Sequence, residues 1–286
     1  MTHSFTRGRL RWRTCTPAEL HTVSKRLAEW PCEAGGALRH MFALAAIEVA
    51  GAGTVRLASD DDRWAAAVVH PGRLVVPMGD ADAILAAGPP TRRWRLMVAD
   101  AAAADAVLAG SGQLDGSIVH HQRLMSLDPD ALPDQAALPD PGLRLAKPAD
   151  AERLADLAVR LHLDDQFGPD PGPAGRRGYL DRMATGIERG SVFCAGPVGQ
   201  PWGKLERSVA SWRWGVQLAG IVVDQSHRGR GLGQALVAAA TRYSLREGPH
   251  RRPIALHVRA ANTTAIRAYE AVGFRDREEW RLVVRS

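Results

Sequence analysis

The chain has little lysine. Lysine occurs only at Lys25, Lys147 and Lys204, so the other 34 of the 37 basic residues are arginine. Arginine favours bidentate contacts with phosphates and carboxylates. A GC-rich genome would also produce this bias, and we give that explanation the larger share. The formal net charge of +6 helps to attract a polyanion but does not by itself indicate a nucleic-acid partner.

Cysteine is also scarce, with Cys15, Cys32 and Cys194 widely separated and no C-x-x-C pair. An odd number without paired spacing supports neither a disulfide framework nor a zinc site, so no metal is expected. The N-terminus lacks a secretory signal pattern. The most apolar stretch, residues 41–55, carries Glu48 and is too short to span a bilayer. The sequence therefore favours a cytoplasmic protein that does not enter a membrane.

A proline-rich segment divides the chain. Residues 127–142 contain four prolines and four aspartates, and proline removes backbone donors and fixes φ. We therefore predict an extended linker at 127–142, between an N-terminal α/β domain at 1–126 and a second domain at 143–286.

Both halves alternate strands and helices, which predicts an α/β fold with a mixed sheet. In the second half, strands are expected at 143–146, 191–195, 205–214, 217–223, 254–258 and 279–284, with helices at 149–161, 177–189, 232–245 and 263–272. In the first half, strands are expected at 10–14, 55–57, 64–69, 73–76, 94–98 and 118–125, with helices at 17–30, 38–50, 82–87 and 101–108. The segments 13–18 (RTCTPA) and 144–149 (RLAKPA) also align. The first half is thus a candidate degenerate copy of the second.

Residues 221–233 read IVVDQSHRGRGLG, a buried strand followed by a glycine-rich turn and a helix start. Glycines bring bare backbone close to a ligand, and the first amides of a helix attract anions. Gln234 and Ala235 replace the Lys and Ser/Thr of a P-loop, which argues against a nucleotide triphosphatase. The third glycine comes one residue too early for a dinucleotide fingerprint.

Two motifs make the second half resemble the GNAT superfamily of N-acetyltransferases. Arg228, Gly231 and Gly233 match the pattern Arg/Gln-x-x-Gly-x-Gly/Ala. Residues 262–274 match N-x-x-A-x-x-x-Y-x-x-x-G-F on a later helix. Over residues 143–284, the predicted strands and helices follow each other in the order found in this superfamily. The whole chain is similar to bacterial two-part GNAT proteins with an uncharacterised N-terminal half. Gln225 departs from the pattern, since proline is frequent there.

The resemblance implies an acyl-CoA-dependent N-acyltransferase, with acetyl-CoA as donor and direct attack by an amine in a ternary complex. The acceptor would be a small molecule or a protein amino group. Tyr269 would be the general acid. The residues that would contact the co-substrate are Ile221, Val222, Val223, Arg228, Gly229, Arg230, Gly231, Leu232, Gly233, Asn262, Ala265 and Tyr269. Residues 76–82 of the first half contain one glycine and two aspartates, so we predict no CoA there.

The general base is left open. Glu206, in Lys204-Leu-Glu206, is a candidate catalytic residue, although a solvated strand residue is an equally good interpretation. His162, Asp164 and Asp165 would recognise a cationic amine or merely end a helix. His257 is a further candidate base, but a buried histidine is more common. Cys194 lies in an apolar strand, which favours a core residue over a nucleophile.

Two other functions remain possible from the sequence. A GNAT fold that binds acyl-CoA without catalysis would act as a sensor. With either function we expect the protein to be a monomer or a homodimer. The alternating arginines of residues 9–13 could bind RNA, but a half-buried edge strand with a solvated arginine face explains them more simply, so nucleic acid is disfavoured.

Overall fold

The computed structural model describes residues 10–111, 116–134, 137–247 and 252–285. Arg9, which begins the alternating arginine segment, lies outside them. The chain divides into two compact units. The N-terminal unit runs to His120 and also includes the segment from Glu279 onward, whereas the C-terminal unit runs from His121 to Glu278. Within the described residues, no helix is long and apolar enough to cross a membrane.

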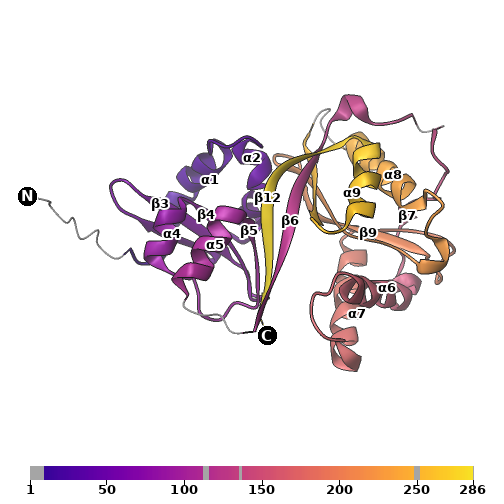
Figure 1. The fold of residues 1–286 in the computed structure, drawn as a ribbon, viewed down its shortest axis with the longest axis horizontal. Coiled ribbons are helices and arrows are strands. Elements are labelled where there is room, and N and C mark those ends of the chain that lie inside the picture. The colour runs from indigo at the N-terminus through magenta and orange to yellow at the C-terminus, as the bar shows by residue number, and fades with distance from the viewer. Residues whose placement is uncertain (1–9, 112–115, 135–136, 248–251, 286) are drawn as a thin grey trace, which may run out of the picture. The chain divides into compact units, whose positions relative to one another are not determined.

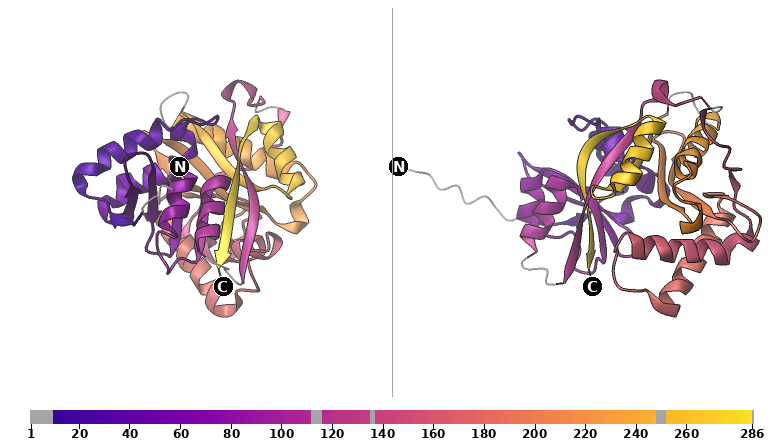
Figure 2. Two further views of the ribbon diagram at one scale, coloured as in Figure 1. Left: turned by 60° about the vertical axis from the view of Figure 1, so that its left-hand side comes forward. Right: turned by 45° about the vertical axis from the view of Figure 1, so that its right-hand side comes forward.

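The N-terminal unit is a mixed sheet with helices on both faces (Figure 1). Its elements are β1 (Arg13–Thr14), α1 (Leu20–Ala28), α2 (Gly36–Arg39), α3 (Met41–Ala50), β2 (Val55–Ser59), β3 (Trp64–Val69), β4 (Leu74–Gly79), α4 (Ala81–Ala87), β5 (Leu96–Asp100), α5 (Ala101–Gly110) and the end of β12 (Phe274–Arg285). The strand order is β1-β2-β3-β4-β5-β12, and only β4 and β5 are parallel. Figure 2 shows α4 and α5 on one face of this sheet and α1 to α3 on the other.

The elements of the C-terminal unit are β6 (Ser117–Leu127), β7 (Arg144–Leu145), α6 (Ala151–Asp164), α7 (Gly172–Glu188), β8 (Val192–Ala195), β9 (Gly203–Ser211), β10 (Gly215–Val223), α8 (Leu232–Arg246), β11 (Ile254–Arg259), α9 (Thr263–Val272) and the start of β12. From β7 onward they repeat the order of the N-terminal unit, with two helices where that unit has three. The strands β7-β8-β9-β10-β11-β6 lie side by side, and only β10 and β11 are parallel. α8 and α9 lie on one face, and α6 and α7 on the other (Figure 1).

Local sequence explains these elements. β3 and β8 are apolar runs whose side chains are almost all buried, as expected for central strands. α6 buries Leu154, Leu157 and Ala158, which share one face at helical spacing. α9 begins at Asn262, whose Oδ1 accepts a 3.1 Å hydrogen bond from the Ala265 amide, and ends at Gly273 in a left-handed conformation. The mixed α/β class predicted from the sequence is confirmed.

The two units repeat one detail of their first turn. In each, an arginine on the first strand binds an acidic side chain six residues later, as Arg13–Glu19 and as Arg144–Asp150. The acidic group also accepts the backbone N–H three residues before it, at 2.8 Å in the first case and 2.7 Å in the second. This shared ion pair and cap extend the sequence match at 13–18 and 144–149, and support an internal duplication.

The two ion pairs differ in burial, which predicts different contributions to stability. The Asp150 side chain is fully buried. Burial alone would raise its pKa, but Arg144 and the amides of Lys147 and Gly199 lower it to about 2. This stabilisation is present above pH ~4 and is lost as the pH falls towards 2. We expect Asp150→Ala to lower the free energy of unfolding at pH 7 by about 3 kcal/mol, because it leaves Arg144 half-buried without its partner.

Glu19→Ala is the matched control in the other unit. Arg13 and Glu19 are partly exposed, so solvent screens their pair and the loss should be much smaller. Urea unfolding of both variants, followed by circular dichroism, compares the two. Equal losses would contradict the assigned importance of burial.

Each unit takes its last strand from the other half of the sequence. β6 pairs antiparallel with β11 over Gln122–Ser126, and β12 pairs antiparallel with β5 over Trp280–Val284. The compact units therefore do not follow the boundaries expected at 127–142 and 143–286. The proline-rich segment comes after β6, a strand that already belongs to the C-terminal unit, and the chain returns to the N-terminal unit near Glu279. Within the expected linker, residues 135–136 lie outside the described part.

Candidate functional site

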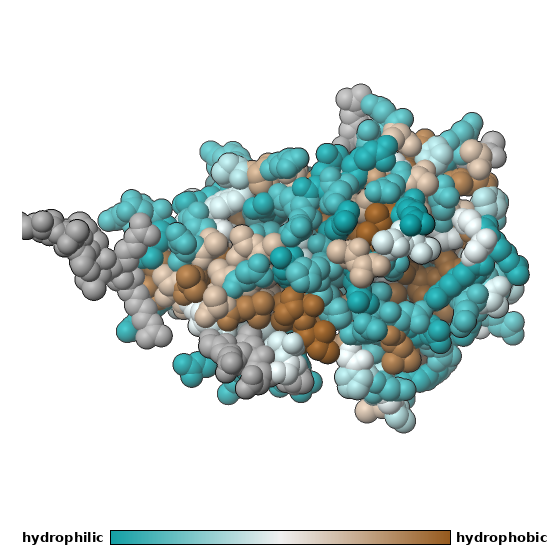
Figure 3. Space-filling model, viewed as in Figure 1, coloured by the Kyte–Doolittle hydropathy of each residue, from teal (hydrophilic) through white to brown (hydrophobic). Residues whose placement is uncertain are grey.

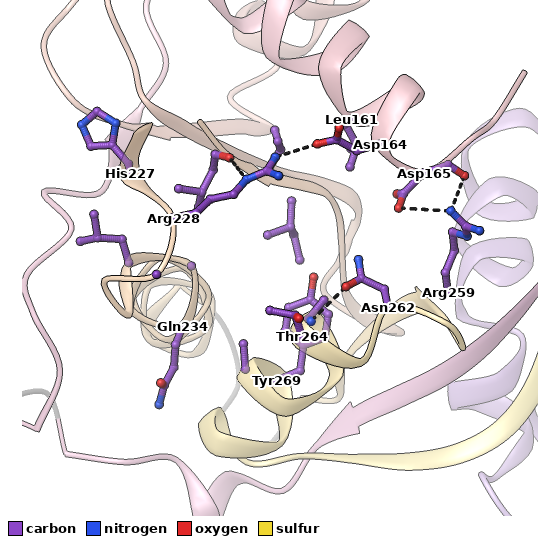
Figure 4. A pocket seen from close by; sticks show the side chains of 18 of the residues that line it. Leu161, Asp164, Asp165, His227, Arg228, Gln234, Arg259, Asn262, Thr264 and Tyr269 are labelled. Carbon is purple, nitrogen blue, oxygen red and sulfur yellow. Dashed lines mark hydrogen bonds and ion pairs between the residues drawn. The ribbon is translucent and has the colours of Figure 1, made fainter. Parts of the chain in front are cut away.

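A cavity of about 900 Å³ lies in the C-terminal unit where β10 and β11 stop pairing. Their parallel register covers only Val216–Leu218 and Ile254–Leu256, after which β10 continues with β9 alone. The opening is lined by β10, by the turn before α8, by α9 and by the end of α6 (Figure 4). Figure 3 shows apolar side chains in a hollow of this unit, surrounded by hydrophilic ones.

The turn that follows β10 forms one wall. The Asp224 carboxylate accepts hydrogen bonds from the Ser226 side chain and amide, which together with Arg153 lower its pKa to about 2. Gly229 and Gly231 adopt left-handed φ values of 77° and 73°, which glycine tolerates without strain. α8 then begins at Leu232 with no side-chain cap at Gly231. Its first amides are therefore available to an anion in the cavity, and the helix dipole favours one there.

Arg228 is held across the mouth of the cavity. Its Nε donates to the Val223 carbonyl at 2.9 Å, and its Nη2 donates to Asp164 at 2.7 Å (Figure 4). Arg160 approaches the other oxygen of Asp164 at 2.9 Å. Of the two arginines predicted to contact the ligand, Arg228 lines the cavity, but Arg230 is exposed and does not line it.

The opposite wall is the first half of α9. Asn262, Ala265 and Tyr269 all line the cavity, as do Ile221, Val222 and Val223 on β10. Only 7% of Tyr269 is exposed, and its ring packs near Phe274 in the core of this unit. Burial, and then the charge of Asp165, raise the pKa of the Tyr269 phenol. A phenol with a raised pKa is protonated at neutral pH and can act as a hydrogen-bond or proton donor.

Asp165 and Arg259 extend the cavity beyond Tyr269. Arg259 Nη1 donates to the Asp165 backbone carbonyl at 2.7 Å, whereas its distance to the carboxylate Oδ1 is 3.9 Å. The sequence suggested Asp164 and Asp165 as acceptor-side residues, and both line the cavity. Arg259 was missed, although an arginine directly after the strand predicted at 254–258 was the available signal.

Glu206 does not line this cavity. Its Oε1 accepts hydrogen bonds from Lys204 at 2.5 Å and from Arg182 at 3.0 Å. Burial raises the pKa of Glu206, but the two cations outweigh burial and lower it overall. Lys204 is fully buried and also donates to the Gly220 carbonyl at 3.0 Å. A carboxylate held in this way is a weak base, so the geometry favours a role in fixing the bulge of β10 at Gly220.

The remaining candidate side chains lie away from the cavity. Burial lowers the pKa of His257 to about 4, so the imidazole is neutral near pH 7. His162 contacts the Pro169 carbonyl and the Tyr179 hydroxyl. Burial raises the pKa of the Cys194 thiol to about 12, which excludes an activated thiolate.

The comparison with protein families shows which family the domain in this unit belongs to. Residues 187–274 match the family described as "Acetyltransferase (GNAT) family". The C-terminal unit contains a GNAT domain. The match includes the cradle of residues 228–233 and the helix that carries Tyr269, and it supports an acyltransferase function. No curated protein matches the chain.

Solved structures extend the GNAT fold over the whole chain. A Drosophila protein has a TM-score of 0.63 at 13% identity and covers 96% of this chain and 98% of its own. A GCN5-related N-acetyltransferase from Sphaerobacter thermophilus has a TM-score of 0.59 at 18% identity, covering 96% and 95%. A tandem GNAT protein from the clavulanic acid biosynthesis pathway has a TM-score of 0.53 at 15% identity, covering 96% and 97%. This likeness includes the N-terminal unit and agrees with a GNAT-like copy there.

The N-terminal unit differs from the GNAT domain at the turn after β4. β4 ends at Gly79, Asp80 is the N-cap residue of α4, and α4 begins at Ala81 without an intervening glycine loop. The Asp80 carboxylate accepts the Trp64 amide at 2.8 Å. The N-cap residue of α4 is therefore an aspartate, whereas the N-cap residue of α8 is Gly231, which has no side chain.

Proposed function

We propose that the protein transfers an acetyl group from acetyl-CoA to a primary amine, and that the co-substrate occupies the cavity between β10 and α9. The observation that carries the proposal is the joint lining of one cavity by uncapped helix amides at Gly231–Gly233 and by the protonated phenol of Tyr269. The amides suit a pyrophosphate, and the phenol suits a leaving thiolate.

The chemistry needs no covalent enzyme intermediate. The amine nitrogen attacks the thioester carbon, the C–N bond forms, and the C–S bond breaks. A backbone amide of β10 would stabilise the developing oxyanion. Tyr269 would give a proton to the departing sulfur, and the proton released by the amine would leave through a base. Apart from these steps, the enzyme mainly positions two substrates.

The wild-type protein tests this proposal directly. Isothermal calorimetry with CoA measures binding, and thiol release from acetyl-CoA across a set of primary amines measures turnover. We expect micromolar or tighter CoA binding, together with amine-dependent thiol release. Tight binding with no turnover on any amine would support a sensor in place of an enzyme.

Tyr269→Phe separates proton donation from binding. We expect kcat to fall about 100-fold, since general acid catalysis contributes factors of this size, while the Kd for CoA changes less than twofold. Tyr243→Phe is the control, because Tyr243 lies on α8 outside the cavity and packs against Phe193. Equal turnover of wild type and Tyr269→Phe would exclude Tyr269 as the acid.

A further inference from the structure

Asp165 differs from the other acidic side chains near the site. Asp164 and Glu206 are each bound by two cationic groups at 3.0 Å or less, and Asp224 is bound by Arg153. The Asp165 carboxylate, by contrast, lies 3.9 Å from Arg259, whose short hydrogen bond goes to the backbone carbonyl of the same residue. Asp165 thus lines the cavity with its carboxylate loosely paired and free to accept a new donor.

The surroundings of Asp165 favour a proton acceptor. Its side chain is only 19% exposed, and burial is the main cause of its raised pKa. Arg259 on β11 opposes this shift, whereas Asp164 on α6 adds to it. Asp165 is also the C-cap residue of α6, where the negative end of the helix dipole further disfavours ionisation. Tyr269 on α9 is close enough for the Asp165 charge to raise the pKa of the phenol.

Asp165 and Tyr269 are therefore two titratable groups that line one cavity from different elements, α6 and α9 (Figure 4). One is a carboxylate that is loosely paired, and the other is a phenol that keeps its proton. A transfer reaction that removes a proton from its nucleophile and adds one to its leaving group needs a pair of this kind.

On the basis of the proposed function, we infer that Asp165 is the residue that binds the ammonium group of the acceptor and takes the proton from it, and that Arg259 holds Asp165 in place. The acceptor is then a cationic amine that approaches the thioester from the α6 side. Its ammonium proton passes to Asp165, the neutral nitrogen attacks the carbonyl carbon, and the thiolate leaves. Tyr269 protonates the thiolate, and the first proton returns from Asp165 to solvent through its exposed edge. The second proton, which the nitrogen loses as the amide forms, passes to the Tyr269 phenolate and restores the phenol.

Asp165→Asn tests the inference with two probe amines. 1,4-Diaminobutane is a strong base that is protonated at pH 7, whereas 2,2,2-trifluoroethylamine is largely unprotonated there. With the diamine we expect kcat/KM of the variant to fall about 100-fold, and with the fluorinated amine less than tenfold, because that amine needs no deprotonation before attack. Asp181→Asn on α7 is the matched control, since Asp181 is exposed and outside the cavity.

The pH profile gives a second measurement that a purely structural role would not change. The kcat/KM of the wild type should fall on the acid side as Asp165 becomes protonated, at a pH above the ordinary aspartate pKa of ~3.9. In Asp165→Asn, this fall of kcat/KM on the acid side (the acid limb) should be absent. Arg259→Gln should move it to higher pH, because the cation that lowers the pKa of Asp165 is gone.

The outcomes separate the two proposals. Wild-type protein that binds CoA but releases no thiol with either probe overturns the proposed function and this inference together. Turnover that Asp165→Asn leaves unchanged in rate and pH profile overturns the inference alone. An equal loss with both amines and an unmoved acid limb assigns Asp165 a structural role, and also overturns it.

Discussion

Gly231→Asp should reduce the affinity for CoA at least about 100-fold. Gly231 lines the cavity as the N-cap residue of α8, and a carboxylate there would lie against the bound pyrophosphate. Two unit charges 4 Å apart interact by about 4 kcal/mol at the effective dielectric of a protein surface, which corresponds to roughly a thousandfold in Kd. Screening by salt reduces this effect, so the calorimetric titration is best done at low ionic strength.

Gly231→Asn is the matched control for the aspartate variant. Asparagine has the same shape as aspartate, and no atom lies within 4 Å of a Cβ added at Gly231. Both side chains meet the same positive φ of 73°, which Asn and Asp tolerate better than other residues. The charge is the main difference between the two variants.

The pair of variants distinguishes charge from backbone strain. We expect Gly231→Asn to bind CoA within about tenfold of the wild type. An equal, large loss in both variants would attribute the effect to strain. If the Kd of Gly231→Asp is unchanged, the pyrophosphate does not lie at this turn.

The cradle could be predicted because its chemistry is local. Three glycines, the strand before them and the helix after them are adjacent in sequence, and they predict the turn and the uncapped helix start without any distant contact. The direction of a surface side chain is not local, and so Arg228 faces the cavity while Arg230 does not. The spacing of residues in the motif did not distinguish Arg228 from Arg230 as a contact of the ligand.

The sequence left the base open because the basicity of a carboxylate depends on the groups that surround it in the fold. Glu206 looked reactive as an acidic residue on a strand, but Lys204 and Arg182 hold its carboxylate and keep its pKa low. From the sequence, Asp165 could recognise a cationic amine or merely end a helix. Its burial and its long carboxylate contact to Arg259, 94 residues away, are the observations on which we propose it as the proton acceptor. The sequence contains Lys204 two residues before Glu206, but it does not show the contacts that Arg182 makes with Glu206 and Arg259 with Asp165.

The compact units differ from the predicted domain boundaries for a related reason. A proline-rich segment marks where regular structure is interrupted, and it does so correctly after Leu127. It does not show which sheet the preceding strand joins. β6 pairs with β11 and β12 pairs with β5, so two strands lie in units that their sequence position would not assign.

The exchange of strands predicts that a fragment of residues 143–286 will not fold. The fragment lacks Met125 and Leu127, which are buried in the core of the C-terminal unit. Loss of each such side chain costs about 2–5 kcal/mol, and their sum is comparable to the 5–15 kcal/mol that stabilises a typical domain. β11 would also lose the partner strand that pairs with five of its residues.

The same fragment carries a segment that belongs to the other unit. Val283 is buried in the core of the N-terminal unit, Trp280 and Leu282 on the same strand are also buried, and all three would be exposed. An apolar, unpaired strand favours aggregation. We expect this fragment to be insoluble or to lack a cooperative thermal transition.

A fragment of residues 121–278 is the matched comparison. It is slightly longer, keeps the part of β6 that pairs with β11, and omits the strand segment that pairs with β5. We expect it to unfold cooperatively in a thermal scan and to bind CoA with a Kd within tenfold of that of the full chain, because the whole cavity lies between Leu161 and Tyr269. If 143–286 folds and binds CoA as well as 121–278 does, β6 is dispensable. The boundary expected from the proline-rich segment would then be the correct one.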